Sequence, residues 1–387
     1  MEDQLHYPEL DVEQFWKDNE LALQDNCFNE NAPQVAFGLD YVEDEVVINE
    51  LEPNIHPWRP MPLPQLMELR KRYNDKAEKI IGKRMLKEEI EPHQYFPPVK
   101  LHGEVLGGVY NVTSDYVTWL SSDIQDPKGL EAMLDNLEKN TLPNLRDFIL
   151  PANWDTEKKR IFEETGRKPD AWWYGRRVRG PVTLAMSIYG VEKMIFLLVD
   201  EPDLAHRFMD DIGDVLMGYI KIFEQEAGIE NIRENQYPYR FNDDNCCMLN
   251  DELYEEFAFP VLKRIFDYAS PKGSGLGRYQ HSDSAMAHLL PVLSKLDFTA
   301  VNFGPTVLLD QIRKYMPNTR VDGCLSPMTL MRNDEEAIIS EVRRDCEMAK
   351  SLNTKGLLIY TAGSVNYGTK LTSIRAAMYA VQKYGRY

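Results

Sequence analysis

From about residue 100 onward, short apolar runs alternate with longer segments in which apolar residues recur every three or four positions. Runs of the first kind predict buried strands, and segments of the second kind predict amphipathic helices. The predicted strands are 172–183, 237–243, 278–282, 297–302, 319–323 and 356–361. Strands that alternate with helices in this way lie parallel and are joined by right-handed crossovers. We therefore predict an α/β fold, a (β/α)₈ TIM barrel with an N-terminal extension.

Two of the predicted helices have a regular apolar face, 204–223 and 337–352. Asn333, with Glu336 three residues later, resembles a helix start signal just before the second of them. An open doubly wound sheet is the other fold that such alternation allows. That fold usually carries a G-x-G-x-x-G turn after an early strand, and this chain has none. The barrel is therefore favoured.

The first 98 residues are rich in proline, glutamate and aromatic residues. We expect an arm packed on the barrel, with a strand-like stretch at 34–40 and helical structure within 65–89. The predicted domains are thus an arm at 1–98 and a catalytic barrel at 99–387. The sequence leaves open whether the arm closes the site or forms the interface of a homodimer.

Composition narrows the class of protein. A length of 387 residues with 43% hydrophobic residues suits a single barrel. No apolar run of about 18 residues occurs, so we expect no membrane span. A net charge of −18 repels phosphate backbones and anionic lipid, so nucleic acid and membranes are not expected partners. The acidic N-terminus does not have the pattern of a secretory signal, so we expect a cytoplasmic location. The five cysteines are widely spaced and odd in number, so we expect reduced thiols.

Polar side chains follow the apolar core of five successive predicted strands, where the catalytic groups of such barrels are found. His281 and Asp283 are two residues apart on one strand, so both side chains can point the same way. With an aspartate from the preceding strand they offer nitrogen and oxygen ligands to one divalent ion, and such a set suits Zn²⁺ with an open fourth position. The predicted metal ligands are Asp243, Asp244, His281 and Asp283.

Each of these residues also has a simpler interpretation. The two aspartates could cap the helix that follows them, and a single histidine is often a hydrogen-bonded core residue. Cys324 alone is typical of a small buried apolar residue. The case for a site comes from the expected meeting of all strand ends on one face of the barrel.

The segment Trp172-Trp173-Tyr174-Gly175-Arg176-Arg177 is rich in aromatic and cationic residues. Alternation along a strand would place Trp172, Tyr174 and Arg176 on one face. Aromatic side chains there could stack on a planar substrate and an arginine could pair with a carboxylate, or the same residues could pack on the arm and pair with its acids. We predict that the catalytic residues are His281, Asp244 and Tyr174, and that the substrate-binding residues are Trp172, Arg176, Asn302, Cys324 and Tyr360.

Short motifs from about residue 170 to the end resemble the uroporphyrinogen decarboxylase superfamily in their order and spacing. They are Gly180-Pro181-Val182-Thr183-Leu184, Val199-Asp200-Glu201-Pro202, Asp243-Asp244, Tyr254-Glu255-Glu256-Phe257, His281-Ser282-Asp283, and the tail with Ala377-Met378 and Tyr384-Gly385. The resemblance implies a (β/α)₈ barrel and one of two chemistries. The members that decarboxylate uroporphyrinogen grip propionate groups with an Arg-Gln-Ala-Gly-Arg motif near the N-terminus. This chain has only Pro57-Trp58-Arg59-Pro60 there.

The other branch transfers methyl groups with a corrinoid (cobalamin) protein, usually at zinc bound by His-x-Cys and a later cysteine. Here the corresponding residues are His281-Ser282-Asp283 and Ser364, so both thiolates are missing. The chain looks more similar to the O-demethylase methyltransferases that cleave methoxylated aromatic ethers with carboxylate and histidine ligands. That resemblance implies a metal bound by His281 and by Asp243 or Asp244, with Asp283 and Glu255 as the next candidates.

Three functional hypotheses follow. The preferred one is a zinc-dependent methyltransferase that moves a methyl group from a methoxylated, aromatic donor to the Co(I) of a corrinoid protein. Oxygen and imidazole ligands favour it, because they leave zinc a hard Lewis acid suited to an ether oxygen. The alternative is a metal-free decarboxylase or lyase in which Arg176, Arg177 or Arg179 holds a carboxylate. The third is a non-catalytic barrel that binds a tetrapyrrole or a corrinoid protein.

Overall fold

The computed structural model describes residues 6–387 except 40–49, 53, 57–58, 115–117, 232–233 and 235. Pro57 and Trp58 of the N-terminal segment therefore lie outside the described residues. The chain forms two compact units. The first consists of Met1–Ile90, Ser282–Ala287 and Thr299–Tyr387, and the second of Glu91–His281 and His288–Phe298. The predicted division into an arm and a barrel remains a prediction.

Three parallel strands belong to the second unit: β4 (Arg177–Arg179), β5 (Tyr239–Asn242) and β6 (Arg278–Ser282). β5 pairs with β4 on one side and with β6 on the other, so the order in the sheet follows the order in the chain. The crossovers between them contain α9 (Pro181–Tyr189), α10 (Val191–Asp200), α11 (Pro202–Ala227), α12 (Asp251–Leu253) and α13 (Phe259–Ala269). The α/β class predicted from the alternation is thus confirmed.

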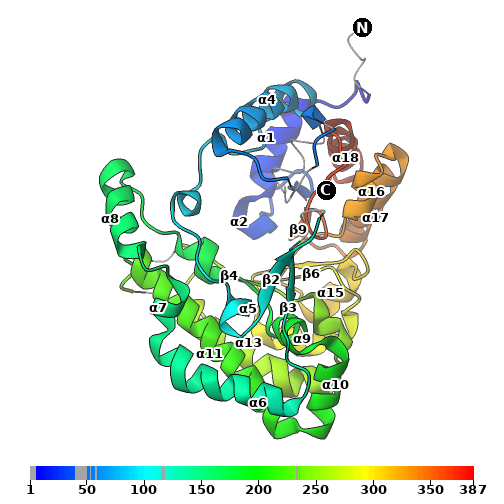
Figure 1. Ribbon diagram of the computed structural model, residues 1–387. Helices are drawn as coiled ribbons and strands as arrows, with labels where there is room; N and C mark the ends of the chain where they lie inside the picture. The colour runs from blue at the N-terminus through cyan, green and yellow to red at the C-terminus, as the bar shows by residue number, and fades with distance from the viewer. Residues whose placement is uncertain are drawn as a thin grey trace. The chain divides into compact units, whose positions relative to one another are not determined.

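The remaining elements of this unit precede β4 or follow β6. They are α5 (His102–Val105), β2 (Val109–Val112), β3 (Thr118–Ser121), α6 (Pro127–Asn136), α7 (Leu145–Ile149), α8 (Trp154–Thr165) and α14 (Leu290–Leu293). β2 and β3 form a separate antiparallel pair. α11 is the long helix of the unit, and α13 lies beside it (Figure 1).

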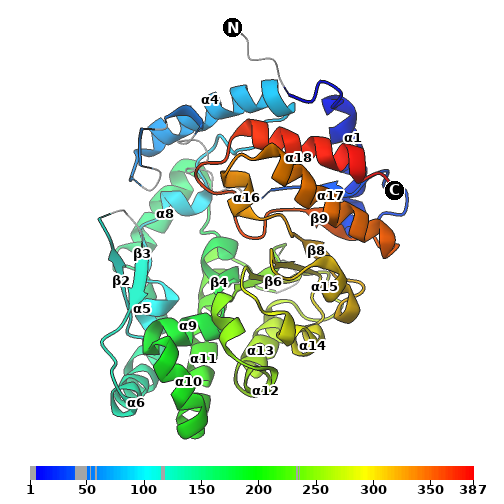
Figure 2. The ribbon, with the colours of Figure 1, turned by 90° about the vertical axis from the view of Figure 1, so that its right-hand side faces the viewer.

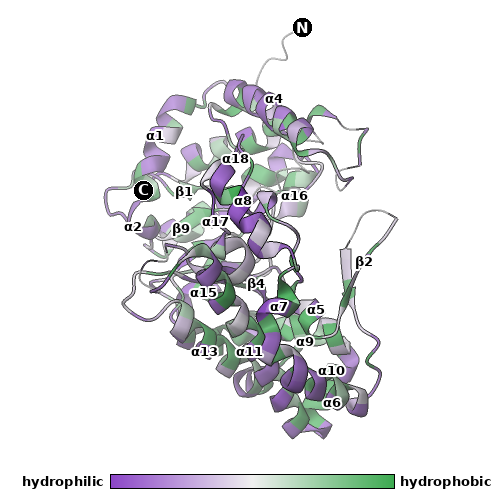
Figure 3. Cartoon of the chain, turned by 60° about the vertical axis from the view of Figure 1, so that its left-hand side comes forward, coloured by the Kyte–Doolittle hydropathy of each residue, from purple (hydrophilic) through white to green (hydrophobic). Residues whose placement is uncertain are grey.

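The apolar stripe predicted for 204–223 is confirmed. Its residues Leu204, Phe208, Ile212, Leu216, Tyr219 and Phe223 are all buried in α11. Hydrophilic and hydrophobic residues alternate along the helices of this unit in the hydropathy view, as expected for amphipathic helices with one face in the core (Figure 3).

The predicted strand 172–183 is wrong over most of its length. Trp172–Arg176 is a π-helical turn, β4 occupies only three residues, and α9 begins at Pro181. Two contacts explain the difference. The Asp170 carboxylate accepts a hydrogen bond from the Trp172 backbone N–H, which starts a turn, and Gly175 lies so close to α11 that an added Cβ would be 3.3 Å from the Tyr219 carbonyl oxygen. Pro181 then fits the first turn of a helix, where no N–H is needed.

The strands of the first unit are also parallel, and they are β1 (Ala36–Phe37), β7 (Ala300–Phe303), β8 (Arg320–Asp322) and β9 (Leu357–Ile359). β8 pairs with β7 and with β9, and β9 also pairs with β1. Its helices are α1 (Val12–Ala22), α2 (Gln24–Cys27), α4 (Leu63–Ile81), α15 (Leu309–Tyr315), α16 (Pro327–Met331), α17 (Glu335–Ser351) and α18 (Leu371–Tyr384). α17 and α18 lie side by side (Figure 2).

The predicted strands of this unit exist, with ends that differ by a few residues from the prediction. The predicted start signal of α17 is wrong by one residue. Asp334 caps the helix by accepting a hydrogen bond from the Ala337 N–H. Asn333 instead has a positive φ of 56°, and its side chain bonds to the backbone of Gly368 and Lys370.

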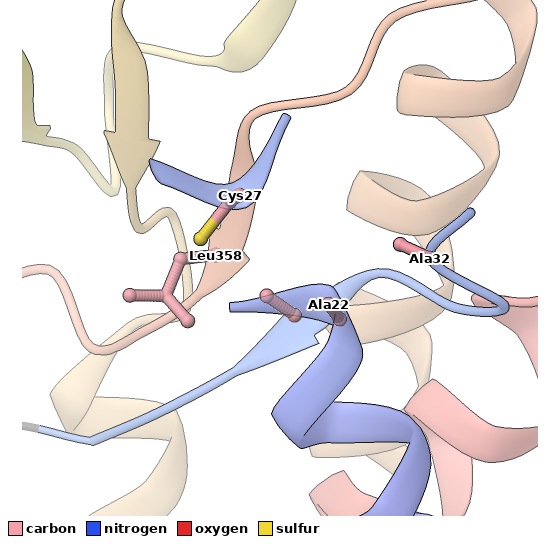
Figure 4. Packing of buried hydrophobic residues seen from close by; sticks show 5 residues of the cluster. Ala22, Cys27, Ala32 and Leu358 are labelled. Atoms are coloured by element: carbon pink, nitrogen blue, oxygen red, sulfur yellow. The ribbon is translucent and has the colours of Figure 1, made fainter. Parts of the chain in front are cut away.

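Small N-terminal residues pack directly on β9. Ala22, Cys27, Ala32, Ala36 and Leu358 form one buried cluster, in which Cys27 lies beside Leu358 (Figure 4). Because alanine and cysteine are small, the N-terminal chain can approach β9 closely enough for β1 to pair with it. The N-terminal segment thereby adds a strand beside β9.

Among the described residues, no single helix is long and apolar enough to cross a membrane. Within the described part of the chain, one pair of helices, α9 and α10, reaches that length and composition when taken together, and the two are bent by 105° at their junction. Eight of the nine residues of α9 are buried within the protein, which is a sufficient reason for their apolar character.

Asp211 offers a test of this core. It lies buried in α11, where burial raises the pKa of its carboxyl to about 7. An acid with a raised pKa contributes stability that is present below its unfolded pKa of about 3.9 and is lost as pH rises through the folded value. We expect Asp211→Asn to raise the free energy of unfolding by roughly 1–3 kcal/mol more at pH 8 than at pH 5, because the amide carries no charge to desolvate.

The measurement is urea unfolding at several pH values. Asp210→Asn is the matched control, since Asp210 is exposed on the same helix and its replacement should change the unfolding free energy little at any pH. Parallel pH curves for Asp211→Asn and the wild-type protein would contradict the prediction.

Candidate functional site

A pocket of about 630 Å³ opens at the carboxyl ends of the three strands of the second unit. β4, β5 and β6 all contribute to its wall, as does β3 of the antiparallel pair. The lining residues are Trp119, Trp173, Arg177, Val178, Arg179, Thr183, Ser187, Asn242, Asp244, Asn245 and His281. Two indoles, two guanidiniums, two amides and a histidine–aspartate pair thus line one hollow.

The register of the strands determines which of these side chains are neighbours. Arg179 pairs with Asn242, and Asn242 pairs with His281, so the three residues form one row across the sheet. The rings of Tyr239 and Phe241 contact Phe266 of α13, so this face of β5 points to the helices. Because side chains alternate along a strand, Asn242 and its row point away from those helices.

The end of the row at β6 brings an imidazole near a carboxylate. His281 Nε2 and Asp244 Oδ1 are 3.9 Å apart. This distance is too long for a hydrogen bond. It is close to the ~3.4 Å that separates two ligands of one tetrahedral zinc ion with bonds of ~2.0–2.1 Å. The His281 side chain is 11% exposed and that of Asp244 is 45% exposed, so both can be reached from the pocket.

Asp243, the neighbour of Asp244, is turned into the protein. Its side chain is fully buried, and Oδ1 accepts hydrogen bonds from the backbone N–H and the hydroxyl of Thr183. Burial raises the pKa of its carboxyl to about 7. Gly180 allows this close packing, because an added Cβ there would be only 2.3 Å from Asp243 Cβ. Asp243 is not among the residues that line the pocket, so its placement does not support the predicted role as a metal ligand.

Thr183 connects this buried carboxyl to the pocket. Its hydroxyl donates to Asp243 at 2.7 Å and accepts from the Asn245 backbone N–H at 3.1 Å. Asn245 follows Asp244 in the 3₁₀ turn Asp244–Met248 directly after β5. Thr183 therefore fixes the turn that carries Asp244.

Most residues of this pocket lie in a part of the chain that matches a known protein family. The pattern of the uroporphyrinogen decarboxylase (URO-D) family matches residues 177–384, more than half of the chain. The chain belongs to the URO-D family. Its fold is that of the (β/α)₈ barrels of the family, as predicted.

Individual relatives carry two different names. The chain is 26% identical over 204 residues to a methylated-thiol–coenzyme M methyltransferase of Methanosarcina mazei, covering 52% of this chain and 51% of the relative. It is 28% identical over 146 residues to a uroporphyrinogen decarboxylase of Myxococcus xanthus, covering 36% and 37%. The chain thus spans about half or less of the curated relatives it matches. A solved methyltransferase structure from Methanosarcina mazei has the same fold, with a TM-score of 0.55 and 14% identity over 91% of this chain and 94% of that one.

The aromatic segment before β4, Trp172–Arg176, has a different structure from the predicted strand. Arg176 is fully buried, where its guanidinium pairs with Glu224 at 2.9 Å and donates to the carbonyls of Tyr237 and Ala269. All the functional nitrogens of Arg176 are thus bonded inside the protein, and this placement does not support a role in substrate binding. Because the segment is a helical turn, Trp173 and not Trp172 reaches the pocket.

Tyr174 lines a second hollow of about 890 Å³, which shares the wall of Trp173, Arg177, Val178 and Arg179 with the first. Its hydroxyl donates to the His93 carbonyl at 3.0 Å, and its ring stacks on Phe223. His102 also lines this hollow, and burial lowers the pKa of its imidazole to about 3, so that it stays neutral. The second hollow is the more apolar of the two, and the predicted catalytic role of Tyr174 remains a prediction.

The other predicted residues belong to the first unit. Asn302 is buried and bonds to backbone groups of Asp322, Thr361 and Gly363. Cys324 is buried as well, with its thiol directed at the Val307 carbonyl, and burial raises the pKa of that thiol. Tyr360 is half-buried against the Ala22 cluster. These roles in substrate binding stay predictions.

Sequence reasoning did not assign a role to Thr183, Asn245, Trp119 or Trp173, although all four line the pocket. The sequence does contain a signal for Thr183, since it belongs to the Gly180–Leu184 motif. It contains no such signal for Trp119, because this residue comes from an antiparallel strand that is not part of the alternating strand and helix pattern.

Thr183 allows a direct test of the link between the buried carboxyl and the turn. We expect Thr183→Val to lower the free energy of unfolding by roughly 1–3 kcal/mol, because Asp243 loses a donor and the Asn245 N–H loses its acceptor. Thr183→Ser keeps the hydroxyl and should stay within about 1 kcal/mol of the wild-type protein. Chemical denaturation of the three proteins measures this, and equal stability of the valine and serine variants would show that the hydroxyl does not contribute.

Proposed function

We propose that this protein is a zinc-dependent methyltransferase that moves a methyl group from a methoxylated, aromatic donor to the Co(I) of a corrinoid protein. The observation that carries the proposal is the His281–Asp244 pair, 3.9 Å apart in a pocket that also holds two indoles. Family membership and the methyltransferase among the relatives support it.

The ligand types suit zinc. An imidazole and a carboxylate oxygen are both common zinc ligands, and both reach the pocket from neighbouring strand ends. Asp283 is an exposed residue of the first unit, and its predicted role as a ligand stays a prediction. When bound, zinc would supply a Lewis acid that polarises the ether oxygen and stabilises a phenolate leaving group.

The chain's own residues would hold and orient the donor. Trp119 and Trp173 offer indole faces on which an aromatic ring can stack, and both line the pocket. In the transfer, the bond between the methyl carbon and the ether oxygen breaks, and the oxygen keeps the electron pair. The cobalt supplies the pair for the new bond to carbon, and the phenolate takes a proton from water after release. Stacking against the indoles would align the methyl group for in-line attack from the open side of the pocket.

The test is zinc content together with methyl transfer. We expect about one zinc per chain in the wild-type protein, and a loss of at least 10-fold in zinc affinity in His281→Ala and Asp244→Ala. With a reduced corrinoid protein and a panel of methoxyphenols and methoxybenzoates, the wild-type protein should release the free phenols, and both variants should lose this activity by 10²-fold or more. His206→Ala is the matched control, because His206 is an exposed histidine of the same unit that lies outside the pocket.

Two results would contradict the proposal. One is a zinc content that is the same in the two variants and in the wild-type protein. The other is the absence of transfer from every donor of the panel by zinc-loaded protein.

A metal-free decarboxylase is the second candidate, since Arg177 and Arg179 line the pocket and could hold a carboxylate. It predicts release of CO₂ by protein freed of metal with a chelator. The predicted cytoplasmic location, the homodimer and the absence of nucleic-acid and membrane partners remain predictions.

A further inference from the structure

The second hollow, of about 890 Å³, has the size and the wall of a small-molecule site. Ligand pockets measure roughly 300–1,000 Å³ and are lined mainly by apolar and aromatic side chains. The wall of this hollow runs from the exposed side chains of Leu101, Val109 and Trp173 to the buried ones of His102 and Tyr219. Every residue that lines it belongs to the second unit.

Two tyrosine hydroxyls of the hollow are already used inside the protein. Tyr219 donates a hydrogen bond to the Lys100 carbonyl, and Tyr174 donates one to the His93 carbonyl. Each of these hydroxyls has therefore given its one proton to a backbone group. The two rings contribute apolar surface to the hollow, and their O–H groups are not available as donors to a ligand.

His102 differs from these tyrosines. The residue is only 8% exposed, and its Nε2 atom is buried with no hydrogen-bond partner among the described residues. Its ring lies against the ring of Tyr219, with the two centroids 3.9 Å apart, so the imidazole is held in place. A buried polar atom without a partner destabilises the folded protein, and in native proteins such an atom usually bonds to a water, an ion or a ligand.

From these observations we infer that the second hollow binds a neutral, mainly apolar molecule with a ring and a hydroxyl group, and that the hydroxyl bonds to His102. A neutral imidazole has one N–H donor and one acceptor nitrogen, and a hydroxyl group can satisfy either of them. The aromatic wall favours a ring, which can stack on it or meet it edge-on.

The state of His102 also determines the charge of the ligand. Burial lowers the pKa of its imidazole to about 3, so the ring carries no charge at neutral pH. A charged ligand would lose its hydration beside an uncharged imidazole and apolar side chains, and this loss disfavours binding. The inferred site is separate from the His281–Asp244 pair of the first pocket and does not depend on the proposed methyl transfer.

Binding of three probes of similar shape to the full chain tests the inference, with affinities measured by ligand-observed NMR titration. The probes are benzyl alcohol, ethylbenzene, in which a methyl group replaces the hydroxyl, and benzylamine, which is charged at neutral pH. We expect the wild-type protein to bind benzyl alcohol roughly 3- to 10-fold more tightly than ethylbenzene, the effect of one hydrogen bond. Benzylamine should bind roughly 10-fold more weakly than benzyl alcohol or worse. Ethylbenzene is the more apolar molecule, so hydrophobic binding alone predicts the opposite order.

Two substitutions of His102 assign the hydrogen bond. His102→Phe removes both ring nitrogens but keeps a ring against Tyr219, and it should lose the preference for benzyl alcohol. Without ligand, the same variant should unfold at a temperature roughly 1–3 °C higher than the wild-type protein, because no unpartnered nitrogen remains buried. His102→Gln keeps a donor and an acceptor and should keep part of the preference.

His206→Phe is the matched control, because His206 is an exposed histidine of the same unit that lines neither hollow. It should bind all three probes and unfold like the wild-type protein. Asp244→Asn locates the probes, since Asp244 lines the first pocket but not the second hollow. We expect this variant to bind benzyl alcohol with unchanged affinity.

Three results would overturn the inference. The first is a wild-type protein that binds benzyl alcohol no more tightly than ethylbenzene, or that binds neither. The second is a preference for benzyl alcohol that persists in His102→Phe. The third is a loss of benzyl alcohol binding in Asp244→Asn, which would place the probe in the first pocket. The zinc and methyl-transfer measurements test the proposed function whichever of these results is found.

Discussion

The register of three parallel strands is the constraint on which the candidate site depends. Burial of Tyr239 and Phe241 against α13 determines which face of β5 points to the helices. Strand pairing then places Arg179, Asn242 and His281 in one row on the opposite face. A slip of one residue would exchange the two faces and turn the row into the helices. The apolar packing beneath the strands and the polar chemistry above them are therefore two results of the same alternation.

Two neighbouring aspartates that follow β5 lie in opposite environments, one buried and one exposed to the pocket. Asp243 is buried, receives two hydrogen bonds from Thr183, and has a raised pKa because it has no contact with water. Asp244 turns outward and approaches His281. The first residue positions the second, because the Thr183 hydroxyl also holds the N–H of Asn245. Thr183 therefore links the buried end of β5 to the pocket, because its hydroxyl bonds both to Asp243 and to the turn that follows.

The charge of the pocket contrasts with that of the whole chain. The protein carries a net charge of −18, yet its candidate site is lined by Arg177 and Arg179. A negative surface repels polyanions over distances of about a Debye length, while arginines at close range bind a single carboxylate through directed hydrogen bonds. The pocket thus carries a local charge opposite to that of the chain as a whole.

Much of the architecture follows from local sequence. Apolar periodicity located α11 and α17 and the cores of β5 to β9. Because the carboxyl ends of parallel strands meet on one face, the sequence also predicted that His281 and an aspartate after β5 lie close together, and His281 lies near Asp244. The strand predicted before β4 was wrong. The aromatic segment there alternates like a strand, but the hydrogen bond from the Trp172 N–H to Asp170 and the close approach of Gly175 to α11 make it a helical turn.

Local sequence could not separate Asp243 from Asp244 or Arg176 from Arg179 either. The members of each pair are chemically alike, and only burial and partners from distant segments make one structural and leave the other open to a ligand. Sequence by itself therefore determined the alternation of strands and helices and the polar residue types at the strand ends. Which of those polar groups faces the pocket was decided by the tertiary structure, because desolvation and hydrogen bonding depend on neighbours that are far away in the chain.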